Sequence, residues 1–285
     1  MFPAGRPELR AIYLQLASGL RVRAVECGKS DAPVVLLVPG WACPAYVFRE
    51  NLVPIANAGY RVIAVELKGH GLSDKPLSPA EYRLGEMRVH VTQILDALEA
   101  SSAIVCGLSM GAALGAHVAV SSPERVRALV MVSPVGFLGV PGLRLARVAT
   151  GRLATPLFPR LAGRWLIETL LAIVNGKLRQ ITDSDVDEYW APTQFPEFIL
   201  AMRHLLHEFN WDAPFTPMNV PTLLVTGSRD RFVSRAAVES YRRIMPAIRH
   251  IEVRNAGHVV YDEAAPIVND AMLEFFQRAS GERPA

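Results

Sequence analysis

Cysteine is scarce in this sequence. Three cysteines occur among 285 residues, at Cys27, Cys43 and Cys106, and they are too few and too irregularly spaced to form a disulfide framework. No Cys-x-x-Cys pair is present, so neither a zinc site nor a redox site has support in the pattern. We therefore expect a protein that uses no metal and no organic cofactor.

The chain also lacks a strong charge of one sign and a long apolar run. Its net charge is +3, and its Lys and Arg residues are scattered rather than clustered, which argues against a nucleic-acid partner. No uninterrupted apolar run is long enough to cross a bilayer. Residues 1–20 do not place a basic patch before an apolar stretch, as a secretory signal would. We expect a cytoplasmic protein without a membrane span, and no feature indicates its oligomeric state.

What the chain does contain is apolar residues in a regular rhythm. They make up 51% of the sequence, which is enough for one large core. Compact apolar runs typical of strands alternate with segments typical of helices, and this alternation predicts βαβ units and a parallel sheet. The expected strands are residues 34–38, 61–65, 103–106 and 126–132, with helices at 46–58, 84–100 and 110–121. Before them, two segments around the turn signal Ser18-Gly19 predict an antiparallel hairpin.

The alternation stops at Pro134, and from there to Pro217 the pattern is helical. It then resumes with a strand at 222–226, a helix at 234–245, a strand at 249–253 and a closing helix at 264–278. We therefore predict an α/β fold with a mostly parallel twisted sheet of about eight strands and helices on both faces. Residues 1–133 and 218–285 would form this core, and residues 134–217 would form an inserted helical cap.

The clearest helix of the predicted cap begins at Pro196, which is well placed for a first helical turn. Its apolar residues share one face, and Phe198 and Met202 belong to that face. We expect these two side chains to bind an apolar part of the substrate.

A Gly-x-Ser-x-Gly run, Gly107-Leu108-Ser109-Met110-Gly111, lies between a predicted buried strand and a helix of small residues. This strand–turn–helix context is typical of a nucleophile elbow. A serine on so tight a turn has strained backbone geometry, and side chains at either glycine would clash with neighbouring segments. The helix N-terminus would favour developing negative charge. The alternative is an ordinary turn in which Ser109 caps the helix.

A serine hydroxyl needs a base to remove its proton. The best candidate is His258, because the loop between the last strand and the closing helix lies at the same carboxyl edge of the sheet as Ser109. His70, in a loop after an earlier strand, could only line the site. The other histidines are expected to be solvated or capping at His90, His204 and His207, packed at His117, and at the start of a strand at His250.

The acid that orients this base should follow another strand end and precede the histidine in the chain. Asp230 meets both conditions, and its carboxylate would hold one imidazole tautomer and stabilise the imidazolium. Two alternatives remain for Asp230: it caps the next helix as a turn residue, or it forms surface ion pairs with Arg229 and Arg231.

The chain resembles the capped α/β-hydrolases along nearly its whole length outside the cap. Four motifs carry the resemblance: Val38-Pro39-Gly40-Trp41, Gly69-His70-Gly71-Leu72-Ser73-Asp74, the Ser109 elbow, and the paired Asp230 and His258 segments. The order Ser, Asp, His is that of the α/β-hydrolase triad. The chain departs from the family at two positions, because Pro39 replaces a usual histidine and Glu66 replaces a usual aspartate.

The resemblance also assigns two donors of an oxyanion hole, the backbone N–H groups of Trp41 and Met110. A plain core role for the Trp41 ring is the competing interpretation, and both can hold because the donor is backbone. Family members that open epoxides or carbon–halogen bonds use an aspartate nucleophile. The serine at position 109 argues against both activities.

We therefore expect an ester hydrolase in which Ser109 attacks the carbonyl, His258 moves the proton and Asp230 orients His258. Its substrate would be a small-molecule ester with an apolar group. Three alternatives share this scaffold: a C–C bond hydrolase of vinylogous diketones, a cofactor-free perhydrolase or haloperoxidase, and a non-catalytic small-molecule receptor. The sequence fits the C–C hydrolase as well as the esterase.

Overall fold

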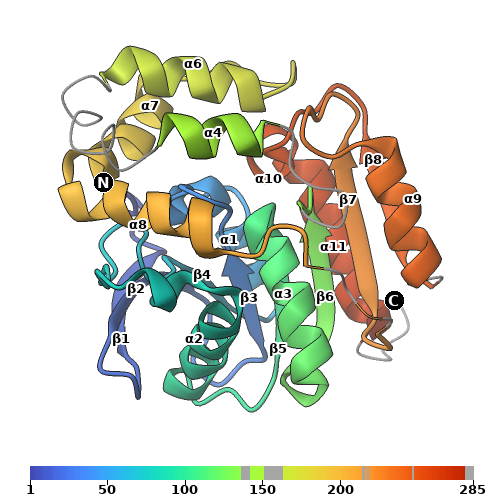
Figure 1. Cartoon of the computed structure of the whole chain (residues 1–285). Helices are drawn as coiled ribbons and strands as arrows, with labels where there is room; N and C mark the ends of the chain where they lie inside the picture. The colour runs from blue at the N-terminus through green and yellow to red at the C-terminus, as the bar shows by residue number, and fades with distance from the viewer. Residues whose placement is uncertain (136–141, 151–162, 214–215, 217, 246, 280–285) are drawn as a thin grey trace.

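A single sheet organises the molecule (Figure 1). The computed structural model describes residues 1–135, 142–150, 163–213, 216, 218–245 and 247–279. Within these ranges the strands form an 8-stranded sheet in the order β1-β2-β4-β3-β5-β6-β7-β8. The strands are β1 (Arg10–Gln15), β2 (Arg21–Cys27), β3 (Val34–Val38), β4 (Arg61–Val65), β5 (Ala103–Leu108), β6 (Val126–Val132), β7 (Thr222–Gly227) and β8 (Arg249–Val253).

Strand direction confirms the predicted hairpin and the predicted parallel sheet. β1 pairs antiparallel with β2, and β2 pairs antiparallel with β4, whereas the other neighbours are all parallel. In the parallel register Val38 lies beside Gly107, and Leu108 lies beside Val132. The carboxyl ends of β3, β5 and β6 therefore come level at one edge of the sheet.

Helices cover both faces of the sheet. The buried side chains of α2, α3 and α9 belong to one hydrophobic cluster, and those of α1, α10 and α11 belong to a second cluster on the other face. These helices are α1 (Leu52–Asn57), α2 (Leu84–Ala97), α3 (Met110–Ser121), α9 (Arg235–Ile244), α10 (Val260–Glu263) and α11 (Ala265–Ala279). Strands covered on both faces must be apolar throughout, and β3, β5 and β7 are buried at every position.

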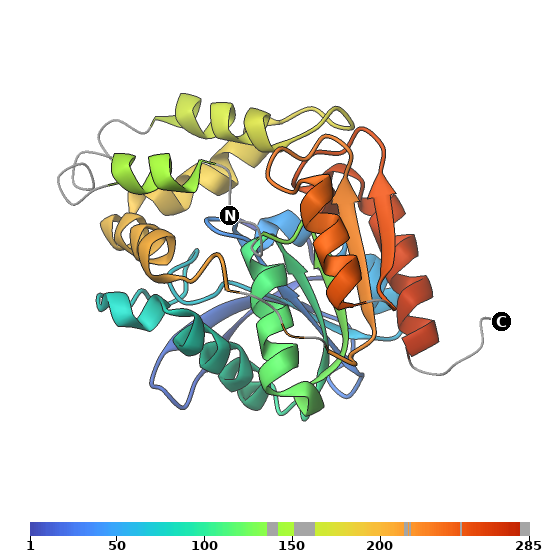
Figure 2. The same cartoon turned by 45° about the vertical axis from the view of Figure 1, so that its right-hand side comes forward.

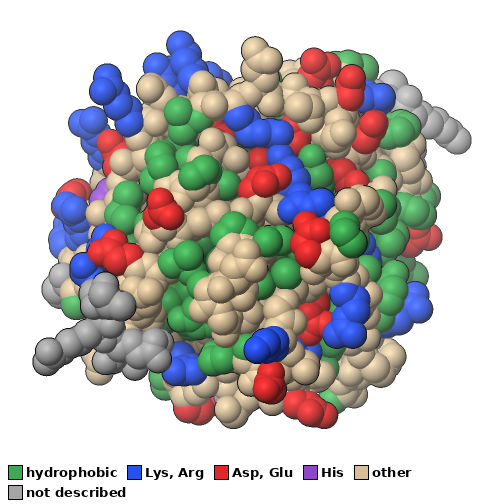
Figure 3. All heavy atoms as spheres, turned by 180° about the vertical axis from the view of Figure 1, so that it is seen from behind, with side chains coloured by type: hydrophobic (Ala, Val, Ile, Leu, Met, Phe, Trp, Pro, Cys, Tyr) green, Lys and Arg blue, Asp and Glu red, His purple; other side chains and the backbone are tan. Residues whose placement is uncertain are grey.

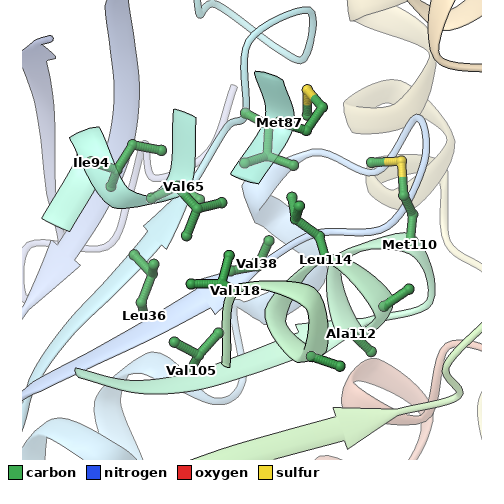
Figure 4. Close-up of a cluster of buried hydrophobic side chains, with 14 of the residues drawn as sticks. Leu36, Val38, Val65, Met87, Ile94, Val105, Met110, Ala112, Leu114 and Val118 are labelled. Carbon is green, nitrogen blue, oxygen red and sulfur yellow. The ribbon is translucent and has the colours of Figure 1, made fainter. Parts of the chain in front are cut away.

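The cluster beneath α2 and α3 shows how this packing supports the edge of the sheet. Strand residues Leu36 and Val105 contact a layer that Ile94 of α2 and Val118 of α3 complete (Figure 4). Met110, at the start of α3, belongs to the same cluster and is fully buried. The N-terminus of α3 is thus anchored by the core.

Within the described ranges, four α-helices lie between β6 and β7 in the chain, and we call them the inserted helices. They are α4 (Leu143–Ala149), α6 (Arg164–Val174), α7 (Asp183–Trp190) and α8 (Pro196–Glu208). Figures 1 and 2 show them above the sheet, on the side where α3 begins. The apolar face of α8 joins the main cluster, whereas α6 and α7 share a small cluster of their own.

Two predicted helices differ from the observed ones. The segment 46–58 is broken into a 3-10 turn, Ala45–Phe48, and the short α1. Beside the break, the Arg49 guanidinium pairs with carboxylates from distant parts of the chain, which a local pattern does not contain. The helix predicted to end at residue 100 ends at Ala97, because Glu99 has a φ of 56° and cannot continue a right-handed helix.

The surface carries charges of both signs. On the face seen from behind, basic and acidic side chains are interspersed (Figure 3), which agrees with the scattered charges of the sequence. None of the helices in the described ranges combines the length and the apolar character that a bilayer crossing requires.

Candidate active site

Ser109 lies on the turn between β5 and α3. Its φ of 53° and ψ of −114° lie where residues with side chains rarely occur. A Cβ added to Gly107 would lie 2.4 Å from the nitrogen of Ala112. One added to Gly111 would lie 2.3 Å from the carbonyl oxygen of Val38. Crowding therefore requires both glycines, as the sequence predicts.

The Ser109 hydroxyl is not used to cap α3. Ser109 occupies the N-cap position, as the alternative expects, but its side chain makes no capping hydrogen bond. Its backbone N–H donates to the Val132 carbonyl at 2.9 Å, and the residue is 9% exposed. The turn is fixed by its backbone, and the side chain is left for another role.

Two backbone N–H groups near this serine have no acceptor among the residues that the structure describes. Met110 begins α3, where the first N–H groups have no partner inside the helix, and Trp41 lies in the loop after β3. Neither N–H donates to an acceptor in the described part of the chain. A Cβ added to Gly40 would lie 3.2 Å from Ser109 Cβ, so the Trp41 loop packs directly against the serine.

Helix α8 faces the same loop. The Trp41 side chain is 37% exposed, and its indole N–H donates to the Met202 carbonyl oxygen at 3.0 Å. The competing interpretation of Trp41 as a core aromatic is therefore wrong. Phe198 and Met202 are buried in the cluster that also contains Met110. Their role in substrate binding stays a prediction.

His258 and Asp230 are joined by a hydrogen bond. His258 Nδ1 lies 2.9 Å from Asp230 Oδ2, and the Asp230 side chain is fully buried. The other carboxylate oxygen accepts the N–H groups of Phe232 at 2.8 Å and Val233 at 3.1 Å. The N-cap of the following helix α9 is Ser234, so Asp230 does not cap it.

The surroundings of Asp230 keep it ionised. Burial alone would raise the pKa of its carboxyl, but the hydrogen bond and charge of His258, together with the Phe232 N–H, lower the pKa below its ordinary value. The alternative of surface pairs with Arg229 and Arg231 is not observed: among the described residues the ion pair of Asp230 is with His258, and Arg229 donates to the Asn255 side chain. The buried carboxylate is thus directed at the imidazole.

Ser109 and His258 lie at the same edge of the sheet. The Ser109 N–H bonds to the end of β6, and the next residue after β6, Ser133, donates its N–H to Val225 in β7. His258 follows β8, and Asp230 follows β7. Between the described residues Ser109 and His258 no hydrogen bond is formed, and such bonds often tighten only when substrate is bound.

Two other carboxylates near the site are engaged elsewhere. Glu66 forms a buried ion pair with Arg23 at 2.7 Å and accepts the Leu72 N–H at 2.8 Å. Asp262 pairs with Arg49 at 2.7 Å and Arg179 at 3.0 Å. The replacement of the family's aspartate by Glu66 therefore affects the support of a loop rather than the His258 partner.

Two of the remaining histidines, His90 and His204, are more buried than predicted. His90 is 2% exposed and accepts the Lys68 N–H at 2.9 Å, and His204 is 5% exposed and stacks on Tyr82. The prediction that both are solvated or capping is wrong, because tertiary packing covers their helix faces. His70 is fully buried, and burial lowers its pKa to about 4.

One residue of this region was not singled out by the sequence. Glu263, at the end of α10, accepts N–H groups from Gly257 and from Gly176. In the sequence, the only sign of this role is that Glu263 follows His258 by five residues, and this spacing does not indicate a contact with Gly176 unless the fold is known. Among the described residues, no cluster of three His, Cys, Asp or Glu side chains is arranged to hold a metal ion.

Known proteins share this architecture. The alpha/beta hydrolase family model matches residues 35–271. The chain is 26% identical to the AB hydrolase superfamily protein YfhM of Bacillus subtilis, over 91% of this chain and 96% of that protein. It is 24% identical to epoxide hydrolase A of Mycobacterium tuberculosis, over 90% of this chain and 94% of that protein.

A solved serine hydrolase involved in carbazole degradation superimposes with a TM-score of 0.77 at 22% identity, covering 94% of this chain and 99% of the other. That likeness concerns the fold. The family model, in contrast, matches the sequence from β3 into α11. The chain belongs to the α/β-hydrolase family.

Proposed function

We propose that this hydrolase cleaves carboxylic esters through an acyl-enzyme intermediate. Ser109 is the nucleophile, His258 is the general base, and Asp230 orients His258. The observation that carries the proposal is the 2.9 Å hydrogen bond between His258 and the buried Asp230, at the sheet edge where the strained Ser109 turn also lies.

In the first half of the reaction, His258 Nε2 takes the hydroxyl proton as Ser109 Oγ attacks the ester carbonyl carbon. The bond to the alcohol oxygen then breaks, and His258 returns the proton to the departing alcohol. In the second half, water gives a proton to His258 and attacks the acyl carbon. The carboxylic acid leaves, and Ser109 Oγ regains its proton. Asp230 stabilises the imidazolium in both halves.

The oxyanion of each tetrahedral intermediate would accept the N–H groups of Trp41 and Met110. Both are backbone donors that have no acceptor among the described residues, so they need no rearrangement when charge develops on the substrate. The loss of one such donor costs about 2.7–4 kcal/mol of transition-state stabilisation in a well-studied hydrolase.

Residues 134–217 would act as a cap that sets substrate range. Phe198 and Met202 come from α8, whose backbone touches the Trp41 loop, so their apolar side chains are well placed to contact an apolar acyl or alcohol group. The partner of this protein is then a small-molecule ester.

The nucleophile favours ester hydrolysis over epoxide hydrolysis, although several similar proteins are named epoxide hydrolases. Family members that open epoxides use an aspartate nucleophile, and this chain has a serine at position 109. A serine attack on a carbonyl gives an ester that water can cleave with the same base.

Labelling by an active-site phosphonate tests the nucleophile. Mass spectrometry should find the label on Ser109 of the intact protein and none on the Ser109→Ala variant. A panel of p-nitrophenyl esters of increasing acyl length, with one dienoic diketone beside it, tests the reaction. Turnover of the diketone with no turnover of any ester would overturn the assignment to esters.

A further inference from the structure

Glu263 connects two segments that are distant in the chain. Its carboxylate is buried, with the residue 6% exposed. Oε1 accepts the N–H of Gly257 at 2.9 Å, and Oε2 accepts the N–H of Gly176 at 2.6 Å. Gly257 precedes His258, whereas Gly176 follows α6 among the inserted helices. Both carboxylate oxygens are therefore used to join the His258 loop to the insertion.

The two segments approach each other too closely for side chains. A Cβ added to Gly176 would lie 2.3 Å from the carbonyl oxygen of Asn255, and one added to Gly257 would lie 2.4 Å from the nitrogen of Gly176. Two backbone bonds add to this contact. The His258 N–H donates to the Val174 carbonyl at 2.7 Å. The N–H of residue 177 donates to the Asn255 carbonyl at 2.9 Å. We call segments 174–177 and 255–258, with Glu263, the histidine clamp.

A buried ion-pair network fixes the residue beside Glu263. Asp262 pairs with Arg49 of the core and with Arg179, which lies between the inserted helices α6 and α7. Asp185 of α7 pairs with the same two guanidinium groups, at 3.2 Å and 2.6 Å. Both carboxylates are less than one-tenth exposed, and buried charges hold their geometry because separation would leave them unpaired. Helix α10 is thus held from both sides.

We propose that Glu263 is a positioning residue that holds the His258 backbone through the inserted helices. The proposal rests on the proposed role of His258 as general base. Asp230 fixes the ring of His258 through Nδ1, but it cannot fix the backbone from which the ring projects. That backbone is held by hydrogen bonds from two successive N–H groups. The Gly257 N–H donates to Glu263, and the His258 N–H donates to the Val174 carbonyl. The insertion therefore contributes to the chemistry as well as to substrate range.

Removing the carboxylate would release this arrangement. A glutamine at position 263 keeps one acceptor oxygen, but its amide NH2 would face the second N–H, so one buried donor loses its partner. A misplacement of about 1 Å of a reacting group can cost about 100-fold in rate. The general base serves every ester in the same way. The loss should therefore fall on kcat, with KM unchanged and with no dependence on acyl length.

Two variants test the clamp from its two sides. Glu263→Gln removes the carboxylate, and Gly176→Ala adds a Cβ that the Asn255 carbonyl does not accommodate. We expect each to lower kcat on short and long esters by about 10- to 100-fold and to slow phosphonate labelling of Ser109 by a similar factor. The matched control is Glu168→Gln, an exposed glutamate of α6, which should behave as the wild type.

Amide hydrogen exchange gives a readout that does not depend on activity. In both variants, exchange should accelerate in segments 174–177 and 255–258, while the central strands keep wild-type protection and so report intact folding. Unchanged exchange in Glu263→Gln would overturn the clamp itself. Faster exchange with wild-type kcat and labelling would overturn its role in positioning His258. If wild-type protein takes the phosphonate on Ser109 but cleaves no ester, only the proposed function fails, because the labelling rates still test the clamp.

Discussion

Asp230 acquires its chemistry from its surroundings. Its side chain is fully buried, yet the hydrogen bond and charge of His258, with the Phe232 N–H, lower the pKa of its carboxyl. A carboxylate in this state can only accept hydrogen bonds, so it selects the imidazole tautomer whose Nδ1 carries the proton. That tautomer leaves Nε2 free to accept a proton from Ser109. An asparagine would keep the shape of the residue but could donate to Nδ1 and favour the wrong tautomer.

We therefore predict that Asp230→Asn lowers kcat/KM on esters by about 10⁴-fold, the effect of the corresponding change in a serine protease. Steady-state kinetics on a short ester measures this, with circular dichroism as the check on folding. Asp270→Asn, an exposed aspartate of α11, is the matched control. Activity within about tenfold of wild type in a folded Asp230→Asn protein would show that the acid lies elsewhere.

Two substitutions of Trp41 distinguish the contribution of its backbone N–H to catalysis from that of its side chain. Trp41→Phe keeps the N–H and a ring but loses the indole bond to the Met202 carbonyl, so activity should fall only moderately. Trp41→Pro also removes the N–H, and a lost oxyanion donor lowers kcat about 10²- to 10³-fold. Kinetics of both variants, with thermal unfolding to check the loop, measure the difference. Equal kcat in the two folded variants would assign the donor to another amide.

At the scale of elements, the sheet could be predicted because its signals are local. Buried runs such as Val34–Val38 must be apolar at every position, and the glycines on either side of Ser109 mark a turn that few other residues tolerate. The break at Arg49 could not be predicted, because its ion pairs reach residues 136 and 213 positions away. The position of Glu263 depends in the same way on Gly176, 87 positions distant. Partners so far apart in the chain leave no periodic signal.

Helix α8 offers a prediction at this scale, because one helix carries both a tie to the Trp41 loop and buried apolar side chains. Phe198→Ala and Met202→Ala should change the ratio of kcat/KM for long and short acyl esters by the equivalent of about 1–3 kcal/mol. Rates on acetate esters should change little. The ester panel measures this shift, with the exposed Phe195→Ala as control. A uniform loss on all esters would indicate damage to folding instead of an altered binding surface.

For the whole molecule, burial of neutral histidines links folding to pH. Burial lowers the pKa of both His70 and His117 to about 4 from an ordinary value of 6.5. As the pH falls below 6.5, the unfolded chain binds protons at these positions but the folded chain does not until about pH 4. Their contribution to stability is therefore complete above pH 6.5 and is lost between pH 6.5 and pH 4. Each full pH unit in this window costs about 1.4 kcal/mol per histidine.

His70→Gln should remove one part of this pH dependence. Between about pH 7.5 and about pH 5, His70 alone accounts for about 2 kcal/mol of the free energy of unfolding that the wild type loses. The variant should therefore lose about 2 kcal/mol less over the same interval, even though the substitution in a fully buried site lowers its stability at neutral pH. Urea unfolding at the two pH values measures both quantities. Because the effect is a difference between two pH values, a general loss of packing at position 70 cancels from it. An identical pH dependence in His70→Gln and wild type would mean that the His70 imidazole has the same pKa in the folded and the unfolded chain, which would contradict the prediction.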